Sequence, residues 1–353
     1  MTVLLHILSW LYGIGAGFRN LLYEAHILRS HRPALPAICV GNLAVGGTGK
    51  TPHVEYLVRL MHDHGIVTAV LSRGYKRRTV GYVEVSTDST TSGVGDEALQ
   101  LKRKFPELIV AVCENRLNGI KHLKNRHPDV QVVLLDDAFQ HRRMQPGYAI
   151  LLTPADRLYV EDKMLPLGRL RESPQGASRA DMVVVSKCPD TIQPIEQRII
   201  DNKLQLPPCK TLVFTKMRYL PLVPAFGGET GRALAPDAIR GKRILLLTGI
   251  AQPRYLADHL RETGADIRVL AFPDHHVFTQ KDIKRIEQNA HEHQAALIVT
   301  TEKDAVRLGE CALPEQLKNN IYIQPIDVQF VGNDQNSFNS NIIHYVKQST
   351  SNR

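Results

Sequence analysis

The chain has 353 residues, enough for two domains, and its hydrophobic content of 43% is ordinary for a folded protein. Its formal net charge of +9 at pH 7 favours an anionic partner: nucleic acid, an acidic membrane surface or a phosphorylated substrate. The five cysteines are odd in number and form no Cys-x-x-Cys pair. This composition excludes a disulfide framework and a zinc cluster, and it favours a reducing compartment.

The first segment is apolar almost all round. Residues 1–18 contain no Lys, Arg, Asp or Glu, and no positive charge precedes the apolar stretch as it would in a secretory signal. Three glycines weaken it as a membrane-spanning helix. We therefore expect a membrane-associated helix over residues 1–30, lying in the membrane interface with Trp10 and Tyr12 at headgroup depth. The alternative is a helix buried against the protein's own core.

The stretch 37–52 has the build of a phosphate-binding loop. A short apolar run leads into a glycine-rich turn that ends in Gly49-Lys50-Thr51, and a helical pattern follows. In such loops backbone N–H groups surround phosphate oxygens, the lysine supplies positive charge and the threonine hydroxyl reaches Mg²⁺. The usual pattern is incomplete because Ala44 stands at its first glycine, and a plain glycine-rich linker is the alternative. The predicted nucleotide-binding residues are Gly46, Gly47, Thr48, Gly49, Lys50 and Thr51.

Short apolar runs, most of them separated by helix-like segments, follow the loop. Runs this short and continuous predict strands buried on both faces, and hence a parallel sheet covered by helices. The fold class is therefore α/β, with a P-loop NTPase-like parallel sheet flanked by helices. The predicted strands cover 67–71, 108–112, 130–135, 149–152 and 182–185.

A change in sequence texture suggests the domain division. We expect a P-loop core domain over residues 31–206 and, at 207–231, an interdomain connector rich in proline and glycine. A smaller C-terminal α/β domain over 232–353 should follow, because strand-like runs recur from Arg243 and from Ala296.

Two adjacent acids, Asp136 and Asp137, end the run that begins at residue 130. In P-loop enzymes a carboxylate at such a strand end lies beside the loop and helps to hold Mg²⁺. The alternative is an acid at the start of a helix. The predicted metal-binding residues are Thr51, Asp136 and Asp137.

A third acidic motif, Gly95-Asp96-Glu97, opens a helical pattern. It reads as an ordinary helix start, with acids favoured by the helix dipole. It also suits a general base, since a kinase needs a carboxylate beside the acceptor hydroxyl.

Two motifs stand out in the C-terminal half. His275 and His276 are adjacent, so they point in different directions on regular structure, and no third ligand is evident for zinc. A histidine near a carboxylate, adjusting it or passing a proton, is the preferred interpretation. In the segment 301–304 a helix-capping box competes with a functional role.

Several basic and polar motifs fall at strand ends or in loops. Arg73 and Tyr75 follow a predicted strand, at the sheet edge where α/β proteins bind ligands. Arg171-Glu172 follows a turn-rich loop, and His141 begins a basic run after the paired acids. Arginine suits bidentate phosphate contact, whereas a solvated charged face is the alternative for each motif.

As a set, these motifs resemble the tetraacyldisaccharide 4′-kinase family, the lipid A 4′-kinases of Gram-negative bacteria. Ala138 and Ala251 stand where the family usually has glycine, which affects loop detail rather than activity. The segments that carry the resemblance, in the family's order, are 40–43, 46–52, 72–75, 95–97, Arg116, 136–137, 140–141, 165–172, 274–275 and 301–306.

The resemblance implies a monotopic enzyme on the cytoplasmic face of the bacterial inner membrane. It would use ATP and Mg²⁺ to phosphorylate the 4′-hydroxyl of tetraacyldisaccharide 1-phosphate, in a cleft that closes between the two domains. By this reading Asp96 is the base, His275 supports it and Lys50 holds phosphate, which makes these three the catalytic residues. The implied substrate-binding residues are Arg73, Tyr75, Arg116, His141, Arg171 and Glu172.

The expected partners are the lipid substrate and the membrane surface. No nucleic-acid module or aromatic platform accompanies the basic charge, and no obligate protein partner is evident. The main alternative function is a membrane-associated P-loop ATPase switch that hydrolyses ATP without a lipid acceptor. The signature lysine of such loops, just before the glycine pair, is here Val45.

Overall fold

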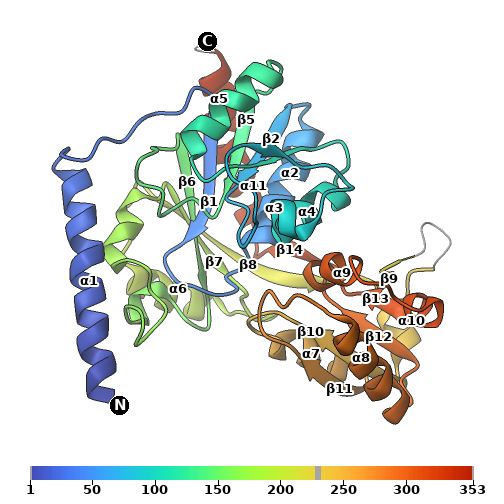
Figure 1. The fold of residues 1–353 in the computed structure, drawn as a ribbon. Coiled ribbons are helices and arrows are strands. Elements are labelled where there is room, and N and C mark those ends of the chain that lie inside the picture. Colours follow the sequence, from blue (N-terminus) through green and yellow to red (C-terminus); the bar gives the residue numbers. More distant parts are fainter. Residues whose placement is uncertain (1, 227–231, 352–353) are drawn as a thin grey trace.

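The computed structural model describes residues 2–226 and 232–351. A larger α/β lobe carries a single long helix, α1 (Thr2–Glu24), along one side and a smaller α/β lobe at one end (Figure 1).

The larger lobe is built on a sheet of nine strands in the described residues, in the order β14-β8-β7-β6-β1-β5-β2-β4-β3. The seven inner strands pair in parallel, whereas β14 and β3 pair antiparallel at the two edges. The predicted parallel sheet is thus confirmed. The strands are β1 (Ala37–Asn42), β2 (Thr68–Ser72), β3 (Val83–Glu84), β4 (Ile109–Val112), β5 (Val132–Asp136), β6 (Tyr148–Pro154), β7 (Met182–Ser186), β8 (Thr211–Tyr219) and β14 (Ile326–Phe330).

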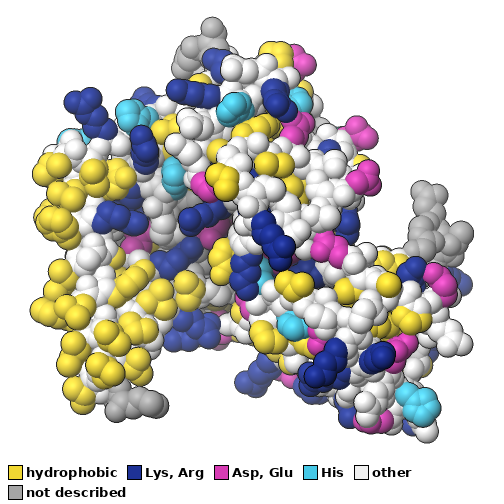
Figure 2. Space-filling view, in the orientation of Figure 1, with side chains coloured by type: hydrophobic (Ala, Val, Ile, Leu, Met, Phe, Trp, Pro, Cys, Tyr) yellow, Lys and Arg dark blue, Asp and Glu magenta, His cyan; other side chains and the backbone are white. Residues whose placement is uncertain are grey.

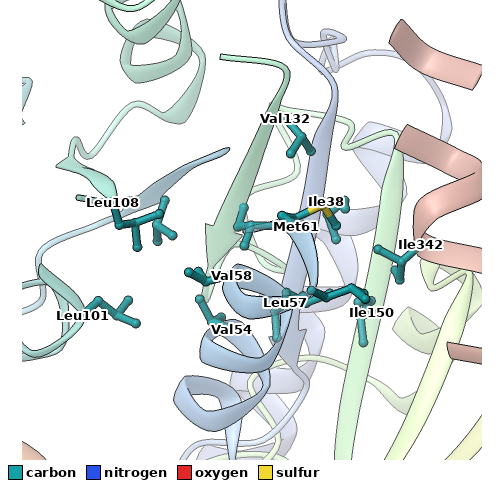
Figure 3. Close-up of a cluster of buried hydrophobic side chains, with 14 of the residues drawn as sticks. Ile38, Val54, Leu57, Val58, Met61, Leu101, Leu108, Val132, Ile150 and Ile342 are labelled. Atoms are coloured by element: carbon teal, nitrogen blue, oxygen red, sulfur yellow. The ribbon is translucent and has the colours of Figure 1, made fainter. Parts of the chain in front are cut away.

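Helices cover both faces of this sheet because its strands are apolar on both sides. In β1, Ile38 and Val40 face one cluster of buried side chains, part of which Figure 3 shows around Ile38. Ala37 and Cys39 face another cluster on the opposite side of the sheet. The first cluster lies under α2 (Lys50–Asp63), α4 (Asp96–Lys104) and α11 (Asp334–Ser351), and the second under α5 (Arg116–Arg126) and α6 (Pro194–Leu204). Shorter helical segments are α3 (Thr91–Val94), η1 (Tyr159–Glu161) and η2 (Pro174–Arg179).

The smaller lobe repeats this layering on a five-stranded sheet of the described residues, in the order β11-β10-β12-β13-β9. One face packs on α8 (Gln280–Glu292), α9 (Glu302–Leu308) and α10 (Glu315–Asn320), and the other packs on α7 (Arg254–Glu262) and η4 (Pro236–Ile239). Its strands are β9 (Val223–Pro224), β10 (Arg243–Thr248), β11 (Asp266–Ala271), β12 (Leu297–Thr300) and β13 (Ile321–Ile323).

Strand pairing crosses the expected domain boundaries. β8 lies within the expected connector at 207–231, yet it is an inner strand of the larger sheet, and β14 and α11 return to that sheet from the expected C-terminal domain. The chain passes between the lobes at 219–223 and at 323–326, where Leu220 N donates to Pro325 O at 3.0 Å. We propose that these two adjacent crossings are the hinge.

The predicted N-terminal helix is confirmed as α1, and the apolar side chains on one side of it are exposed. Leu4, Trp10 and Phe18 are 60%, 67% and 61% exposed, and Figure 2 shows an apolar strip over α1 with Lys and Arg side chains beside it. Polar contacts join α1 to the core, including Ser9 Oγ to Met164 O at 2.8 Å. In the described residues, no helix combines the length and apolarity required to cross a membrane.

Candidate active site

The phosphate-binding loop lies between the carboxyl end of β1 and the start of α2, beside the central strands of the larger sheet. Gly49 precedes α2 with φ of 85°, and a Cβ there would lie 2.9 Å from Met217 Cε, so this turn needs glycine. Two bonds hold the loop from below: Asn42 Nδ2 donates to Thr48 Oγ1, and Ser186 Oγ donates to Thr48 O, each at 2.8 Å. These two bonds fix the position of Thr48 in the loop.

Asp137 ties the loop to the far side of the cleft. Lys50 Nζ lies 3.6 Å from Asp137 Oδ1, and Arg171 donates to both carboxylate oxygens at 2.8 and 3.1 Å. Burial alone would raise the pKa of Asp137, but Lys50 and Arg171 outweigh it and hold the pKa well below its usual range. Asp137 is therefore an anion that holds the side chains of Lys50 and Arg171 in place.

Asp136, at the end of β5, fits a divalent cation. It is 3% exposed, and its Oδ1 atom is buried without a hydrogen-bond partner. Burial and the nearby charges of Glu97 and Asp137 raise the pKa of Asp136 to about 7, against the opposing effect of Lys50 and Arg116. In the described residues no three His, Cys, Asp or Glu side chains converge on one metal position. A cation here would take its other ligands from hydroxyl, water and phosphate, as Mg²⁺ does.

Asp96 and His275 meet across the two lobes. Asp96 is the first residue of α4, and His275 lies in the loop after β11 with φ of 58°. Besides its hydrogen bond with His275, the Asp96 carboxylate accepts from Glu97 N at 3.0 Å. It also lies 3.6 Å from Arg307 Nε. Burial would raise the pKa of Asp96, but the hydrogen bond from His275 and the charges of Lys303 and Arg307 lower it overall.

The neighbouring histidine has a different environment. His276 Nε2 lies 3.1 Å from Asp282, whose carboxylate also caps α8 at Thr279. The geometry thus supports His275, rather than His276, as the histidine that supports Asp96. In the segment 301–304, Thr301 caps α9 because its side chain accepts from Asp304 N, whereas the Asp304 carboxylate accepts from Thr301 Oγ1 and from Gly249 N.

The remaining predicted residues are placed around the same cleft. Arg73 and Tyr75 follow β2, and the Tyr75 ring lies 4.8 Å from that of His275. Arg116 begins α5, is 2% exposed and donates to Cys113 O at 2.7 Å. Burial and neighbouring arginines lower the pKa of His141 to about 4, so this side chain is neutral at neutral pH.

Glu172, which was expected to bind substrate, lies behind the cleft and supports other residues. Its side chain is fully buried and does not line the cleft. It accepts from Arg179 at 2.8 Å, from Gln140 at 3.0 Å and from Asn20 of α1 at 3.1 Å. Glu172 therefore joins the N-terminal helix to the loop that carries Arg171.

These residues share one cavity of about 1540 Å³ between the lobes. Asp96 is 5% exposed and lies just behind its wall, covered by His275. The predicted residues that line the cavity are Gly46, Gly47, Thr48, Gly49, Lys50, Thr51, Arg73, Tyr75, Arg116, Asp136, Asp137, His141, Arg171 and His275.

Sequence reasoning missed Lys187, which follows β7 at the same sheet edge. Its Nζ atom lies 3.8 Å from the position that a Cβ on Gly47 would take, and 2.8 Å from Gln252 of the smaller lobe. Burial lowers the pKa of Lys187 to about 8. A lysine directly after a buried strand was the available signal. Lys303 was missed too, although it lies inside a motif that the resemblance included.

Comparisons with known proteins agree with this geometry. A family model described as tetraacyldisaccharide-1-P 4′-kinase matches residues 1–347. The tetraacyldisaccharide 4′-kinase of Bacteroides thetaiotaomicron is 46% identical over 360 residues, covering 99% of this chain and 94% of that protein. That of Parabacteroides distasonis is 44% identical over 346 residues, covering 96% and 93%.

A solved structure is also similar. The crystal structure of LpxK from Aquifex aeolicus in complex with ATP matches with a TM-score of 0.73 and 26% identity, covering 97% of this chain and 98% of that chain. The resemblance drawn from the motifs is thereby confirmed. The chain belongs to the tetraacyldisaccharide-1-P 4′-kinase family.

Proposed function

We propose that this chain transfers the γ-phosphoryl group of ATP to the 4′-hydroxyl of tetraacyldisaccharide 1-phosphate, a step of lipid A biosynthesis. The observation that carries the proposal is a phosphate-binding loop and a buried carboxylate–imidazole pair brought to one cavity. Family membership and the likeness to an ATP complex support the same activity.

The residues of the loop have distinct roles in this proposal. Backbone N–H groups of residues 46–51 surround the phosphates, and Lys50 neutralises part of their charge. Thr51, Asp136 and Asp137 are the candidates to hold Mg²⁺, which when bound neutralises charge on the phosphate oxygens. The unpartnered Oδ1 of Asp136 supports this assignment.

In the transfer step, the 4′-oxygen forms a bond to the γ-phosphorus as the bond to the β-phosphate oxygen breaks and ADP leaves. Asp96 accepts the hydroxyl proton. His275 orients the Asp96 carboxylate through its hydrogen bond. Asp96 and its partners His275 and Arg307 come from different lobes, so closure assembles this group and excludes water, which limits wasteful hydrolysis.

The lipid substrate and the membrane belong to the proposal as well. The bare apolar side of α1 suits a helix lying in the membrane interface, and the neighbouring basic side chains suit anionic headgroups. With α1 tied to the Arg171 loop through Glu172, a lipid held at the membrane would reach the cavity from that side. The proposed location is the cytoplasmic face of the bacterial inner membrane, where ATP is available.

The direct experiment measures transfer of labelled γ-phosphate from ATP to tetraacyldisaccharide 1-phosphate in detergent micelles with Mg²⁺. A labelled bisphosphorylated lipid is the expected product. Release of labelled inorganic phosphate without labelled lipid would contradict the proposal and favour the ATPase switch.

A further inference from the structure

A lysine of the smaller lobe contacts the imidazole of His275 from the side opposite Asp96. Lys303 Nζ lies 3.1 Å from His275 Nε2, while His275 Nδ1 lies 2.9 Å from Asp96 Oδ2. Both ring nitrogens are therefore engaged. Lys303 is 17% exposed, and its Nζ atom also lies 3.2 Å from Glu97 and 3.8 Å from Asp274.

The chemistry of the two groups fixes where the imidazole proton lies. Burial would lower the pKa of Lys303, but Glu97, Asp96 and Asp274 raise it overall, so the side chain stays an ammonium. An ammonium only donates, so His275 Nε2 must accept and carries no proton. The remaining ring proton is then on Nδ1, where it points at the Asp96 carboxylate.

We propose that Lys303 is a positioning residue that holds His275 as the neutral Nδ1–H tautomer and thereby keeps a hydrogen-bond donor aimed at Asp96. This inference rests on the proposed function, in which Asp96 receives the hydroxyl proton. It also assigns His275 a restricted role: with both nitrogens engaged, the imidazole orients the carboxylate and does not itself carry the proton.

The arrangement depends on the relative position of the lobes. Lys303 lies on α9 of the smaller lobe, and its carboxylate partner Glu97 lies on α4 of the larger lobe beside Asp96. The contact to Glu97 places the ammonium at His275 when α9 lies against α4. Lys303 thus links closure of the cleft to the tautomer of His275.

A purely structural role would predict a different result. In that case Lys303 would only bridge the lobes through Glu97, and loss of any comparable bridge would have the same effect. The chain offers such a bridge in Glu310, whose carboxylate accepts from the Oγ1 atom of Thr91 at 2.6 Å, away from His275. Glu310→Gln is therefore the matched control.

The first measurement is the tautomer itself, on wild-type protein labelled with [¹⁵N]histidine at pH 8. The His275 signals are assigned by their loss in His275→Asn. We expect a protonated Nδ1 and an unprotonated Nε2 in wild type, and a protonated Nε2 in a substantial fraction of Lys303→Met. Wild-type His275 protonated at Nε2, or an unchanged tautomer in Lys303→Met, would overturn the proposal.

The second measurement is lipid phosphorylation by the same proteins. Lys303→Met should lower kcat about 10- to 100-fold with the KM for ATP nearly unchanged, since the effect is on the reacting carboxylate. Lys303→Arg, which keeps a donor-only cation, should recover part of the loss, and Glu310→Gln should keep kcat within about twofold. Equal losses in Lys303→Met and Glu310→Gln would contradict the proposal.

The two measurements separate this inference from the proposed function. Absence of labelled lipid with wild-type protein would count against the kinase, whatever the spectra show. The tautomer spectrum needs no turnover, so it tests Lys303 even then.

Discussion

His275 and Asp96 are 179 residues apart in sequence, yet His275 Nδ1 lies 2.9 Å from Asp96 Oδ2. The histidine belongs to the smaller lobe and the aspartate begins a helix of the larger lobe. With the contacts of Arg307 to Asp96 and of Lys303 to Glu97, this contact brings side chains of the smaller lobe to the carboxylate that we propose as the base.

Asp96→Asn should lower kcat for lipid phosphorylation by about 100-fold or more, since a positioned general base contributes about 10²–10⁴-fold. The amide keeps the shape of the side chain, so binding of ATP should change little. Steady-state phosphorylation and ATP binding by calorimetry measure the two effects.

Asp237→Asn is the control for this prediction, because Asp237 is exposed and pairs with Arg240 on the surface of the smaller lobe. It should keep the wild-type rate. Full activity in Asp96→Asn would remove Asp96 from the role of base.

The site was predictable where its residues follow a strand end. Asp136 ends β5 and Arg73 directly follows β2, while Lys50 follows β1 after the glycine-rich turn, and parallel strands bring their carboxyl ends to one edge. Strand positions were predictable for the same reason, because a sheet covered on both faces requires continuous apolar runs.

The other features of the site and fold depend on contacts between segments far apart in the sequence, which no local pattern encodes. Lys303 reads as an ordinary residue in the first turn of a helix until α9 is placed beside α4. Glu172 shows the same limit: it was expected to contact substrate, but packing buries it under α1. The segment 207–231 was expected to be a connector with two short strand-like pieces, and no local pattern indicated that β8 joins the larger sheet as an inner strand.

Gly49→Ala should weaken both stability and nucleotide binding. A Cβ at φ of 85° costs about 1–2 kcal/mol and would also lie 2.9 Å from Met217 Cε, so the loop must shift. We expect a lower thermal midpoint and a raised KM for ATP.

Gly65→Ala separates these two effects. Gly65 ends the same helix with φ of 66°, but its added Cβ would contact nothing within 4 Å. It should lower the thermal midpoint to a similar extent without changing the KM for ATP. An equal rise in KM in both variants would mean that the loop shape is not specifically required.

Glu55 gives a pH dependence with a definite sign. Burial and the nearby carboxylate of Glu302 raise its pKa to about 7, although Lys104 lies 2.6 Å from both carboxylates. A carboxyl group with a raised pKa binds more protons in the folded state, so its contribution to stability falls as pH rises from about 4.5 through 7.

We therefore compare the stability of Glu55→Gln with that of wild type at two pH values. The difference should favour the variant more at pH 8 than at pH 6. Differential scanning calorimetry at the two pH values measures this, and we expect the difference in thermal midpoint to shift by about 2 °C or more. Glu315→Gln, at an exposed pair with Lys318, should show no such shift. Absence of the shift would mean that Lys104 dominates and that Glu55 stays ionised at both pH values.

The apolar side of α1 predicts binding to lipid surfaces. Trp10→Ser combined with Phe18→Ser removes two side chains that are 67% and 61% exposed, each worth about 1.5–3 kcal/mol if buried in a membrane. Co-sedimentation with vesicles containing anionic lipid should fall at least tenfold. Val80→Ser and Ile195→Ser, at exposed apolar positions on the larger lobe, should bind as wild type does. If the α1 variant binds vesicles as strongly as these controls, the helix face does not contact the membrane, and its apolar strip has another partner.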